Sequence, residues 1–413
     1  MNNYSNPSIW RLEKKPQLFT SREKLVLLML LLSSMNFYLY GRHIMIFAFL
    51  VYCVFAGRVH YVKGVGATIL LSTAILFFKP DALDGPSTIT RWLVWPMAFL
   101  LGYEMTAINC TDESGAEKMN KRVNYYMLII AAGFFIHFAL NFYFNKGQTD
   151  LGRNTNDFWS KDIKSATGQA AAACIPLGWC VASFINNTNF LKKIPSIIGL
   201  VIIFQYNLTL STRTIFFMML LVAIVAVLYL ILSGEKAQKK TYTVLVLLAI
   251  LFAVVLAYQS DLFNMKSNFE DSSFYDRFFT KGGENISEDS RWEYKKKFLE
   301  LAPLYIWGGG RIRRRVGGYA HDLFLDTHDE AGVLALVAVI MIVFSSIRVL
   351  IRLLKNKQIR FETRMTVLCI FSALYMEFLV EPILAGMSEL LMAFCFFCGM
   401  NICINQHLGE KYS

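Results

Sequence analysis

The sequence contains little charge for its length. Only 17% of its 413 residues are charged, whereas 55% are hydrophobic; soluble globular proteins average about 25% charged and 45–50% apolar residues. The apolar residues also come in nearly uncharged blocks of roughly 15–20 residues, the length with which a helix crosses a bilayer. The composition therefore excludes an ordinary soluble domain and predicts an all-α integral membrane protein.

The sequence also lacks the short motifs of several enzyme and carrier classes. It has no HExxH zinc motif, no P-loop, no glycine-rich dinucleotide fingerprint and no aspartate-rich metal motif for nucleotide sugars. Few acidic residues lie within the apolar blocks, and no chain of buried carboxylates typical of a proton-coupled transporter is evident. No cleavable signal peptide is evident either, because residues 1–24 are polar and mixed. We expect no metal and no cofactor.

The cysteines do not form a disulfide framework. All eight lie in or beside apolar segments. Cys395 and Cys398 have CxxC spacing, but they stand in an apolar run among phenylalanines. We predict that they are small buried hydrophobic residues rather than a redox or metal site.

Hydrophobic windows predict about twelve membrane-spanning helices, with an uncertainty of about two because the second and third are short. The expected spans are Leu25–Tyr40, Ile44–Ala56, Val65–Phe78, Trp92–Ile108, Tyr125–Phe144, Ala166–Ile185, Ile194–Leu210, Thr214–Ser233, Thr241–Tyr258, Ala331–Leu350, Thr366–Leu384 and Met387–Ile404.

The distribution of basic residues predicts the orientation. With the N-terminus inside, the inner segments hold 22 Lys and Arg residues and the short outer segments hold eight. Cytoplasmic loops collect Lys and Arg, so the net charge of +11 indicates membrane topology rather than nucleic-acid binding. The expected organisation is a cytoplasmic segment 1–24, nine spans in 25–258, an extracytoplasmic loop 259–330, three spans in 331–404 and a cytoplasmic tail 405–413.

The long loop is longer than a connector needs to be, and such loops are usually functional or disordered. Its many aromatic residues favour order, and residues 288–301 have helical periodicity. We expect short helices on the outer face of the membrane.

Arginines near this face are the first candidates for chemistry. Arg213 follows Ser211 and Thr212 between two apolar spans with almost no loop, and an arginine at such a depth is costly unless it serves a site. The competing interpretation is that it reaches the outer headgroups. Arg291, and the cluster from Arg311 to Arg315 that contains Arg313, are further candidates because guanidinium groups match phosphate oxygens. The alternative for such a cluster is a solvated or headgroup-facing surface.

A histidine stands where the loop enters the tenth span. His321 precedes apolar residues 323–325, which look like a helix start packed on the bundle, and a histidine can act as a general base near neutral pH. His328 is the rival; its wholly polar neighbours, residues 327–330, indicate a solvated position, so we rank it second. Lone histidines are usually structural, but the neighbouring arginines favour a function here.

Together and in order, these motifs resemble the O-antigen ligase and O-antigen/capsule polymerase superfamily of bacterial inner membranes. The resemblance covers most of the chain: the span layout, the long loop, Arg213 after a hydroxyl pair, Arg291, and His321 with nine residues between Asp322 and Gly332. Two positions depart from the family pattern, namely Asp322 in place of Asn, Ser or Gln, and Ala335 in place of Gly, Thr or Tyr. Arg153-Asn154 with residues 157–159 and 166–168 looks more like the polymerases.

The resemblance implies a metal-independent glycosyltransferase with a membrane-embedded, GT-C-like helical fold. Its reaction would polymerise undecaprenyl-diphosphate-linked oligosaccharide repeat units of an O-antigen or capsule on the periplasmic face. Arg213 and Arg291 would hold the donor diphosphate, His321 would take the acceptor proton or orient the acceptor hydroxyl, and Arg153 would bind diphosphate or sugar. From the arginine cluster, Arg313 is a further candidate for substrate binding.

Two alternatives remain open at this point. The first is an O-antigen ligase that transfers the glycan to lipid A core, and the second is a non-catalytic flippase or exporter of lipid-linked sugars. A flippase should line a central cavity with charge, whereas here the charges gather at the outer face. The expected partners are membrane lipids and a flippase and chain-length regulator of the same pathway.

Overall fold

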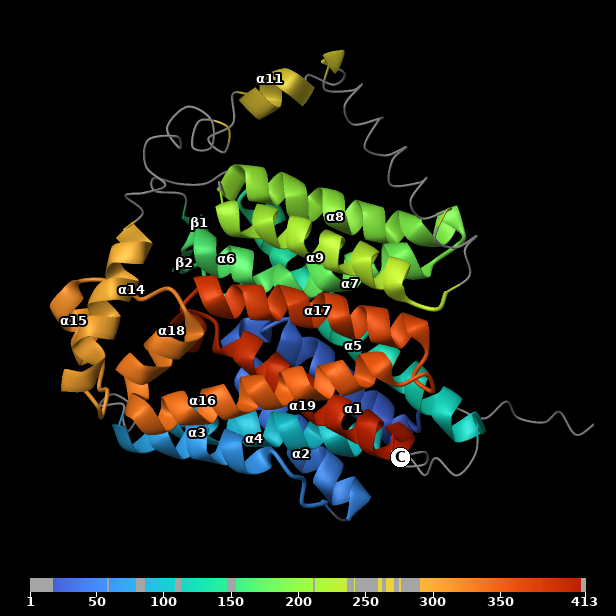
Figure 1. The fold of residues 1–413 in the computed structure, drawn as a ribbon, viewed down its shortest axis with the longest axis horizontal. Coiled ribbons are helices and arrows are strands. Elements are labelled where there is room, and N and C mark those ends of the chain that lie inside the picture. Colours follow the sequence, from blue (N-terminus) through green and yellow to red (C-terminus); the bar gives the residue numbers. More distant parts are fainter. Residues whose placement is uncertain are drawn as a thin grey trace, which may run out of the picture.

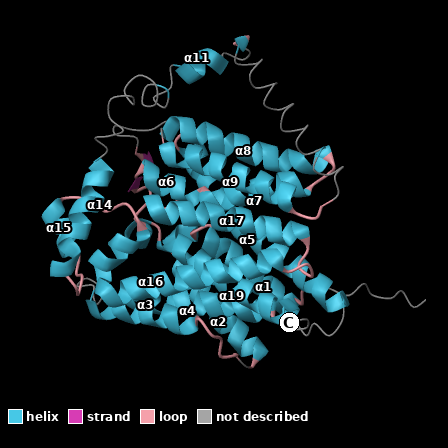
Figure 2. Cartoon of the chain, viewed as in Figure 1, coloured by secondary structure: helices cyan, strands magenta, loops and turns pink. Residues whose placement is uncertain are grey.

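The computed structural model describes residues 18–57, 59–78, 86–107, 113–146, 154–210, 212–235, 241, 259–261, 265–270, 275 and 290–409. Within these ranges the protein is almost entirely helical, which confirms the all-α prediction (Figure 2). The strands in the described part are the two-residue β1 (Thr155–Asn156) and β2 (Ile163–Lys164), which pair as an antiparallel hairpin.

The long helices lie side by side in one bundle (Figure 1). The described helices of the first half of the chain are α1 (Ser21–Ser34), α2 (Gly41–Ala56), α3 (Val65–Phe78), α4 (Pro86–Thr106), α5 (Glu113–Phe144), the short α6 (Ala166–Ala172), α7 (Cys174–Asn186), α8 (Phe190–Leu210) and α9 (Arg213–Leu232). The second half adds the long helices α16 (Leu323–Lys355), α17 (Phe361–Val380) and α19 (Ser388–Gly409), and the shorter helices α11 (Met265–Glu270), α14 (Ser290–Leu301), α15 (Arg311–Val316) and α18 (Ile383–Gly386).

In the described part of the chain, seven helical segments are long and apolar enough to cross a membrane, which indicates a multi-pass membrane protein. They are α5, α6 with α7, α8, α9, α16, α17 and α19, and the shorter α2 and α3 are apolar as well. Every expected span except the ninth falls on a described helix; most of the ninth, residues 242–258, lies outside the described residues. The total of twelve spans stays a prediction.

Two helix boundaries differ from the sequence prediction in ways that matter for the site. The helix expected to begin at Ala331 begins at Leu323 and is kinked at Ala331 and Gly332. The helix expected to run to Leu384 ends at Val380, because Pro382 follows Glu381 and a residue before proline is driven out of the helical conformation. Glu381 is therefore extended, with φ −136° and ψ 150°.

The bundle is held together by contacts in which helix backbones touch. A Cβ added to Gly102 of α4 would lie 2.0 Å from the carbonyl oxygen of Phe396, and one added to Gly399 of α19 would lie 1.9 Å from that of Phe99. The two glycines therefore let α4 and α19 approach each other more closely than any side chain would permit, as small residues do between membrane helices. Cys395 and Cys398 are buried on the same helix, as predicted.

We predict that Gly399→Ala lowers the free energy of unfolding by about 1–3 kcal/mol, because the new methyl group must displace backbone atoms of α4. Thermal unfolding of the detergent-purified protein, followed by size-exclusion chromatography, measures this loss. Gly66→Ala is the matched control, since a Cβ at this helical glycine meets nothing within 4 Å. Equal melting temperatures for the two variants would contradict the close contact.

Candidate functional site

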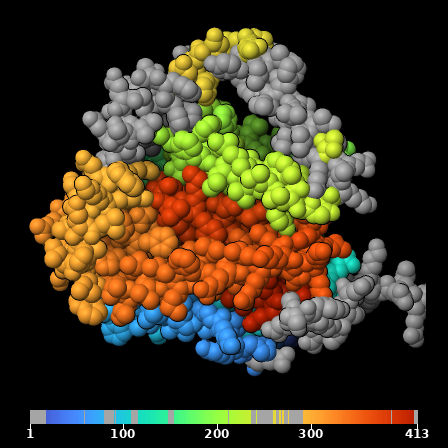
Figure 3. Space-filling model, in the orientation of Figure 1, coloured from blue at the N-terminus to red at the C-terminus, as the bar shows by residue number. Residues whose placement is uncertain are grey.

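The segment from α14 to the start of α16 forms a cap at one end of the bundle (Figure 1, Figure 3). Its small core consists of Phe298, Ile312 and Ala320, all almost fully buried. The helix predicted from periodicity at residues 288–301 is confirmed in its described part as α14. The cap is ordered because its aromatic and aliphatic side chains have a core of their own to fill.

Two acidic residues of α16 bind the first turn of α15 and so hold the cap against the bundle. Asp329 Oδ1 accepts hydrogen bonds from the backbone N–H groups of Ile312 (2.8 Å) and Arg313 (3.3 Å), which begin α15. Glu330 Oε1 lies 2.7 Å from the guanidinium of Arg313. Burial opposes the charge of Arg313, but the carboxylate of Glu330 outweighs it and raises the pKa of Arg313 further above its usual value.

A pair of glycines lets the cap loop rest on the kink of α16. Gly332 has φ 76° and ψ −172°, a conformation that is essentially restricted to glycine. Its would-be Cβ lies 2.6 Å from the oxygen of Ile306, and that of Gly308 lies 2.4 Å from the nitrogen of Gly332. Val333 N–H then donates to the oxygen of Ile306 at 2.8 Å. Gly332, singled out by its spacing from His321, thus has a structural reason to be glycine.

His321 lies in the turn between the cap and α16. Its backbone is left-handed, with φ 55°, an uncommon conformation for a residue other than glycine. Next to it Asp322 is the N-cap of α16, since its side chain accepts a hydrogen bond from Leu325 N–H at 2.7 Å. Aspartate is among the residue types that cap helix N-termini best, so Asp322 has a structural role at the start of α16.

Glu381 connects the candidate residues. Its carboxylate, 2% exposed, receives the guanidinium of Arg291 at 3.3 Å and the hydroxyl of Thr214 at 3.3 Å on Oε1. Its Oε2 lies 3.7 Å from Nδ1 of His321. The structure therefore brings together two of the predicted site residues, Arg291 and His321, on one buried carboxylate.

Arg213 lies in α9, next in sequence to a residue that contacts Glu381. It is the first residue of α9, half-buried, and directly precedes Thr214, whose hydroxyl contacts Glu381. Arg291 reaches the cluster from α14 and also lies 3.5 Å from the carbonyl oxygen of Val380 at the end of α17. Arg291 and the start of α9 at Arg213 thus meet at Glu381 from separate elements, through the Arg291 side chain and the Thr214 hydroxyl. Lys295 of α14 donates to Leu379 O at 2.7 Å and lies 3.6 Å from Asp322.

Glu381 was not among the candidates from sequence, although a signal was present. An acidic residue followed by proline at the end of an apolar span marks a carboxylate that leaves the helix at the membrane face. Glu377 lies one turn deeper in α17, is fully buried, and has no hydrogen-bond partner for either carboxylate oxygen among the described residues.

The other candidates have different positions from those expected. His328 was interpreted as solvated, and this is wrong: it is 5% exposed, because residues 323–330 form the first two turns of α16 and pack under the cap. Arg313 makes the Glu330 ion pair and lies over the ring of Tyr319 at 5.0 Å, so its described contacts are structural. Arg153 lies outside the described residues.

The hairpin after Arg153 is held by a buried hydrogen bond between Asp157 and His137. Asp157, fully buried, lies 2.9 Å from Nε2 of His137 in α5, and its Oδ1 accepts from the N–H groups of Trp159 and Ser160. Burial alone would raise the pKa of Asp157, but the hydrogen bonds from His137 and Ser160 outweigh it and hold that pKa well below its usual range. The Trp159 indole donates to Met35 O at 3.2 Å, which anchors the hairpin to α1.

The cluster contains the side chains needed to transfer a phosphate-linked group to a hydroxyl, with phosphate as the leaving group. Arg291 is partly exposed, with its side chain 31% accessible, so its remaining N–H groups can meet an anion. A histidine beside a carboxylate can take a proton while the carboxylate stabilises the resulting cation. Among the described residues, no three His, Cys, Asp or Glu side chains converge as a metal site.

We predict that Asp157→Asn destabilises the hairpin by roughly 1–3 kcal/mol at neutral pH, because it weakens hydrogen bonds to a buried charge. Because the folded-state pKa is depressed, this stability is present above the unfolded-state value near 4 and disappears as the pH falls through the lower folded-state value. Limited proteolysis within residues 154–164 measures it. Asp162→Asn, at an exposed position of the same turn, is the control; equal cleavage rates would contradict the prediction.

Comparison with known proteins leaves the family as a prediction from motifs. No protein-family model matches the chain. A search of curated proteins found no significant match either.

Proposed function

We propose that the protein is a polysaccharide polymerase that joins undecaprenyl-diphosphate-linked oligosaccharide repeat units at the periplasmic face of a bacterial inner membrane. The observation that carries the proposal is the convergence of Arg291 and His321 on Glu381, beside the start of α9 at Arg213. This cluster lies where the cap meets the bundle, so an amphiphilic donor could hold its lipid in the membrane and its sugar outside.

In the proposed reaction, a hydroxyl of the acceptor sugar loses its proton to His321. The hydroxyl oxygen then bonds to the anomeric carbon of the donor sugar as the bond from that carbon to the diphosphate oxygen breaks. Undecaprenyl diphosphate departs with the electron pair, and Arg213 and Arg291 stabilise the negative charge that develops on it. The fixed arginines take the place that a divalent cation has in many glycosyltransferases.

Glu381 is a positioning residue in this scheme. Its Oε2 lies 3.7 Å from Nδ1 of His321, beyond hydrogen-bond distance, so it acts on the ring through charge and stabilises the imidazolium after proton transfer. Its second oxygen fixes Arg291, so one buried carboxylate sets the distance between the proton acceptor and the phosphate ligand. Nε2 of His321 is the ring atom left to face the acceptor hydroxyl.

We predict that His321→Ala reduces polymer formation by a factor of about 10²–10⁴ and Arg291→Ala by about 10²–10³, from loss of the general base and of charge stabilisation respectively. Polymer length on gels and turnover of purified lipid-linked repeat units provide the measurement. Lys296→Ala, at an exposed position of the same helix as Arg291, should keep wild-type activity. Long chains from either site variant, at normal protein levels in the membrane, would overturn the assignment.

We predict that turnover of purified lipid-linked substrate persists in an excess of chelator. In the proposed mechanism the arginines, which remain charged at any working pH, supply the positive charge. A loss of activity that added divalent cation restores would contradict this mechanism and leave the reaction class open.

Glycan analysis of a deletion strain separates the polymerase from its alternatives. Single repeat units attached to lipid A core support the polymerase, because only chain growth is lost. Long lipid-linked chains that never reach the core would indicate a ligase that uses the same residues. Repeat units retained on the cytoplasmic side would indicate a flippase.

A further inference from the structure

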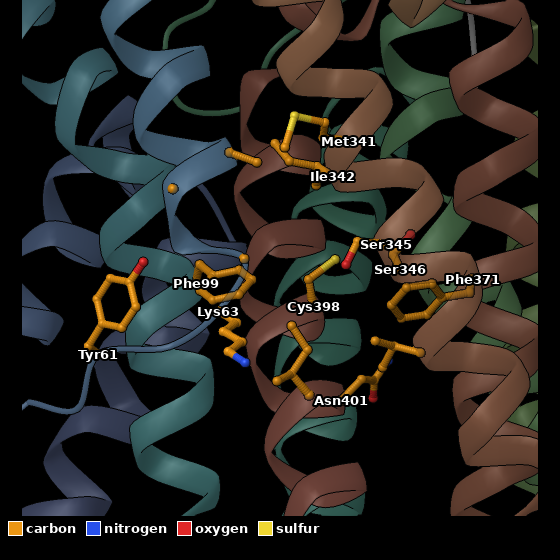
Figure 4. Close-up of a pocket in the computed structure, with 15 residues that line it drawn as sticks. Tyr61, Lys63, Phe99, Met341, Ile342, Ser345, Ser346, Phe371, Cys398 and Asn401 are labelled. Atoms are coloured by element: carbon orange, nitrogen blue, oxygen red, sulfur yellow. The ribbon is translucent and has the colours of Figure 1, made fainter.

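A cavity of about 330 Å³ lies between helices at the opposite end of the bundle from the cap. It is lined by residues at the start of α3, by α4, by the second half of α16, and by α17 and α19 (Figure 4). Helix α3 spans the distance between the two ends, since its last residue, Phe78, stacks on Trp307 of the cap at 5.2 Å while Gly66 near its start lines the cavity. This volume is within the range of ligand sites.

One polar side chain in the cavity has no hydrogen-bond partner among the residues that the structure describes. Asn401 of α19 lines the cavity and is 1% exposed, yet neither its Nδ2 nor its Oδ1 makes a hydrogen bond to any described residue. An amide buried without hydrogen bonds costs free energy that native proteins avoid by supplying a partner. Asn401 therefore calls for a ligand that both accepts and donates a hydrogen bond.

The rest of the lining is mostly apolar, with the hydroxyl-bearing Tyr61, Ser345 and Ser346 among it and a cation at its edge. Phe99, Ile342 and Phe371 supply hydrocarbon surface, whereas Lys63, just before α3, is exposed and makes no ion pair with another described residue. Water is a poor occupant for this part of the cavity, because cavities with apolar walls tend to stay dry. The lining fits an amphiphile with an anionic end towards Lys63.

The helices leave room for such a molecule to enter from the membrane. A Cβ at Gly66 would meet nothing within 4 Å, so the groove beside α3 is open there, and Met341 on the facing side of α16 is 51% exposed. Basic pockets between membrane helices are a known way of holding anionic lipid headgroups. The remaining acyl chain would then lie along the outside of α16.

We propose that this cavity is a binding site for one anionic glycerophospholipid of the leaflet opposite the cap, which is the cytoplasmic leaflet in the topology proposed above. Lys63 pairs with its phosphate. Asn401 donates to an ester or phosphate oxygen through Nδ2 and accepts from a headgroup hydroxyl through Oδ1. The start of an acyl chain fills the apolar part beside Phe99 and Phe371. The site is independent of the polymerase proposal.

Native mass spectrometry of the full chain, purified from nanodiscs of equal phosphatidylglycerol and phosphatidylcholine, tests the proposal. We expect one phosphatidylglycerol retained per chain in preference to phosphatidylcholine. Lys63→Ala should lower that preference about fivefold, since it removes one cation near the headgroup, and Asn401→Leu should lower retention about tenfold through loss of its hydrogen bonds. Gly66→Phe should displace the lipid by filling the groove.

Two matched variants serve as controls. Lys357→Ala removes an exposed lysine that does not line the cavity, and Gly234→Phe fills open space at a glycine far from it in the sequence; both should retain lipid as the wild type does. Only variants that elute at the wild-type volume in size-exclusion chromatography are compared. If Gly66→Phe fails this test of folding, the result for Asn401→Leu decides whether the proposal holds. No retained lipid, equal retention of the two lipids, or wild-type retention by Asn401→Leu would each overturn the proposal.

Discussion

Glu381, buried directly after the end of α17 beneath the cap, carries a negative charge that needs polar or positively charged neighbours. Three separate elements supply these groups. Arg291 comes from α14, Thr214 from α9, and His321 from the turn before α16. The desolvation free energy of an unpaired carboxylate in a protein interior is larger than the stabilisation that any single contact in the cap provides. The position of Glu381 therefore determines how the cap docks on the bundle and how the candidate catalytic groups face one another.

The cap holds this geometry because it is locked to α16 by backbone contacts as well as by charge. Gly308 and Gly332 bring the loop against the helix kink, and Asp329 and Glu330 bind the start of α15. The spacing between His321 and Gly332 thus has a physical meaning. The residues between them include the N-cap Asp322 and the buried first turns of α16. The segment ends at the kink, where the backbone conformation requires glycine.

Much of the architecture follows from composition and periodicity. Apolar blocks predicted where the bundle helices lie, although α5 begins at Glu113 rather than Tyr125 and α16 begins at Leu323 rather than Ala331. The aromatic content of the long loop correctly indicated structure from Ser290 to Glu330. The errors arose where tertiary contacts override local polarity. Residues 327–330 are polar in sequence but buried in the structure, because their partners come from α15 and the preceding loop; His328 was misplaced for this reason.

The sequence by itself determined that this is a helical, multi-pass membrane protein and which charged residues stand near the face that carries the cap, because hydrophobic length and charge are local properties of the chain. It could not show which of those charges meet. In the sequence, the whole of α16 and α17 lies between Arg291 and Glu381. Their contact exists only because Pro382 ends α17 at the point where the cap folds back on it. The position of Asn401 beside a cavity, with no side-chain hydrogen bond to another described residue, is likewise decided by tertiary structure, because it depends on which side chains the neighbouring helices bring to it.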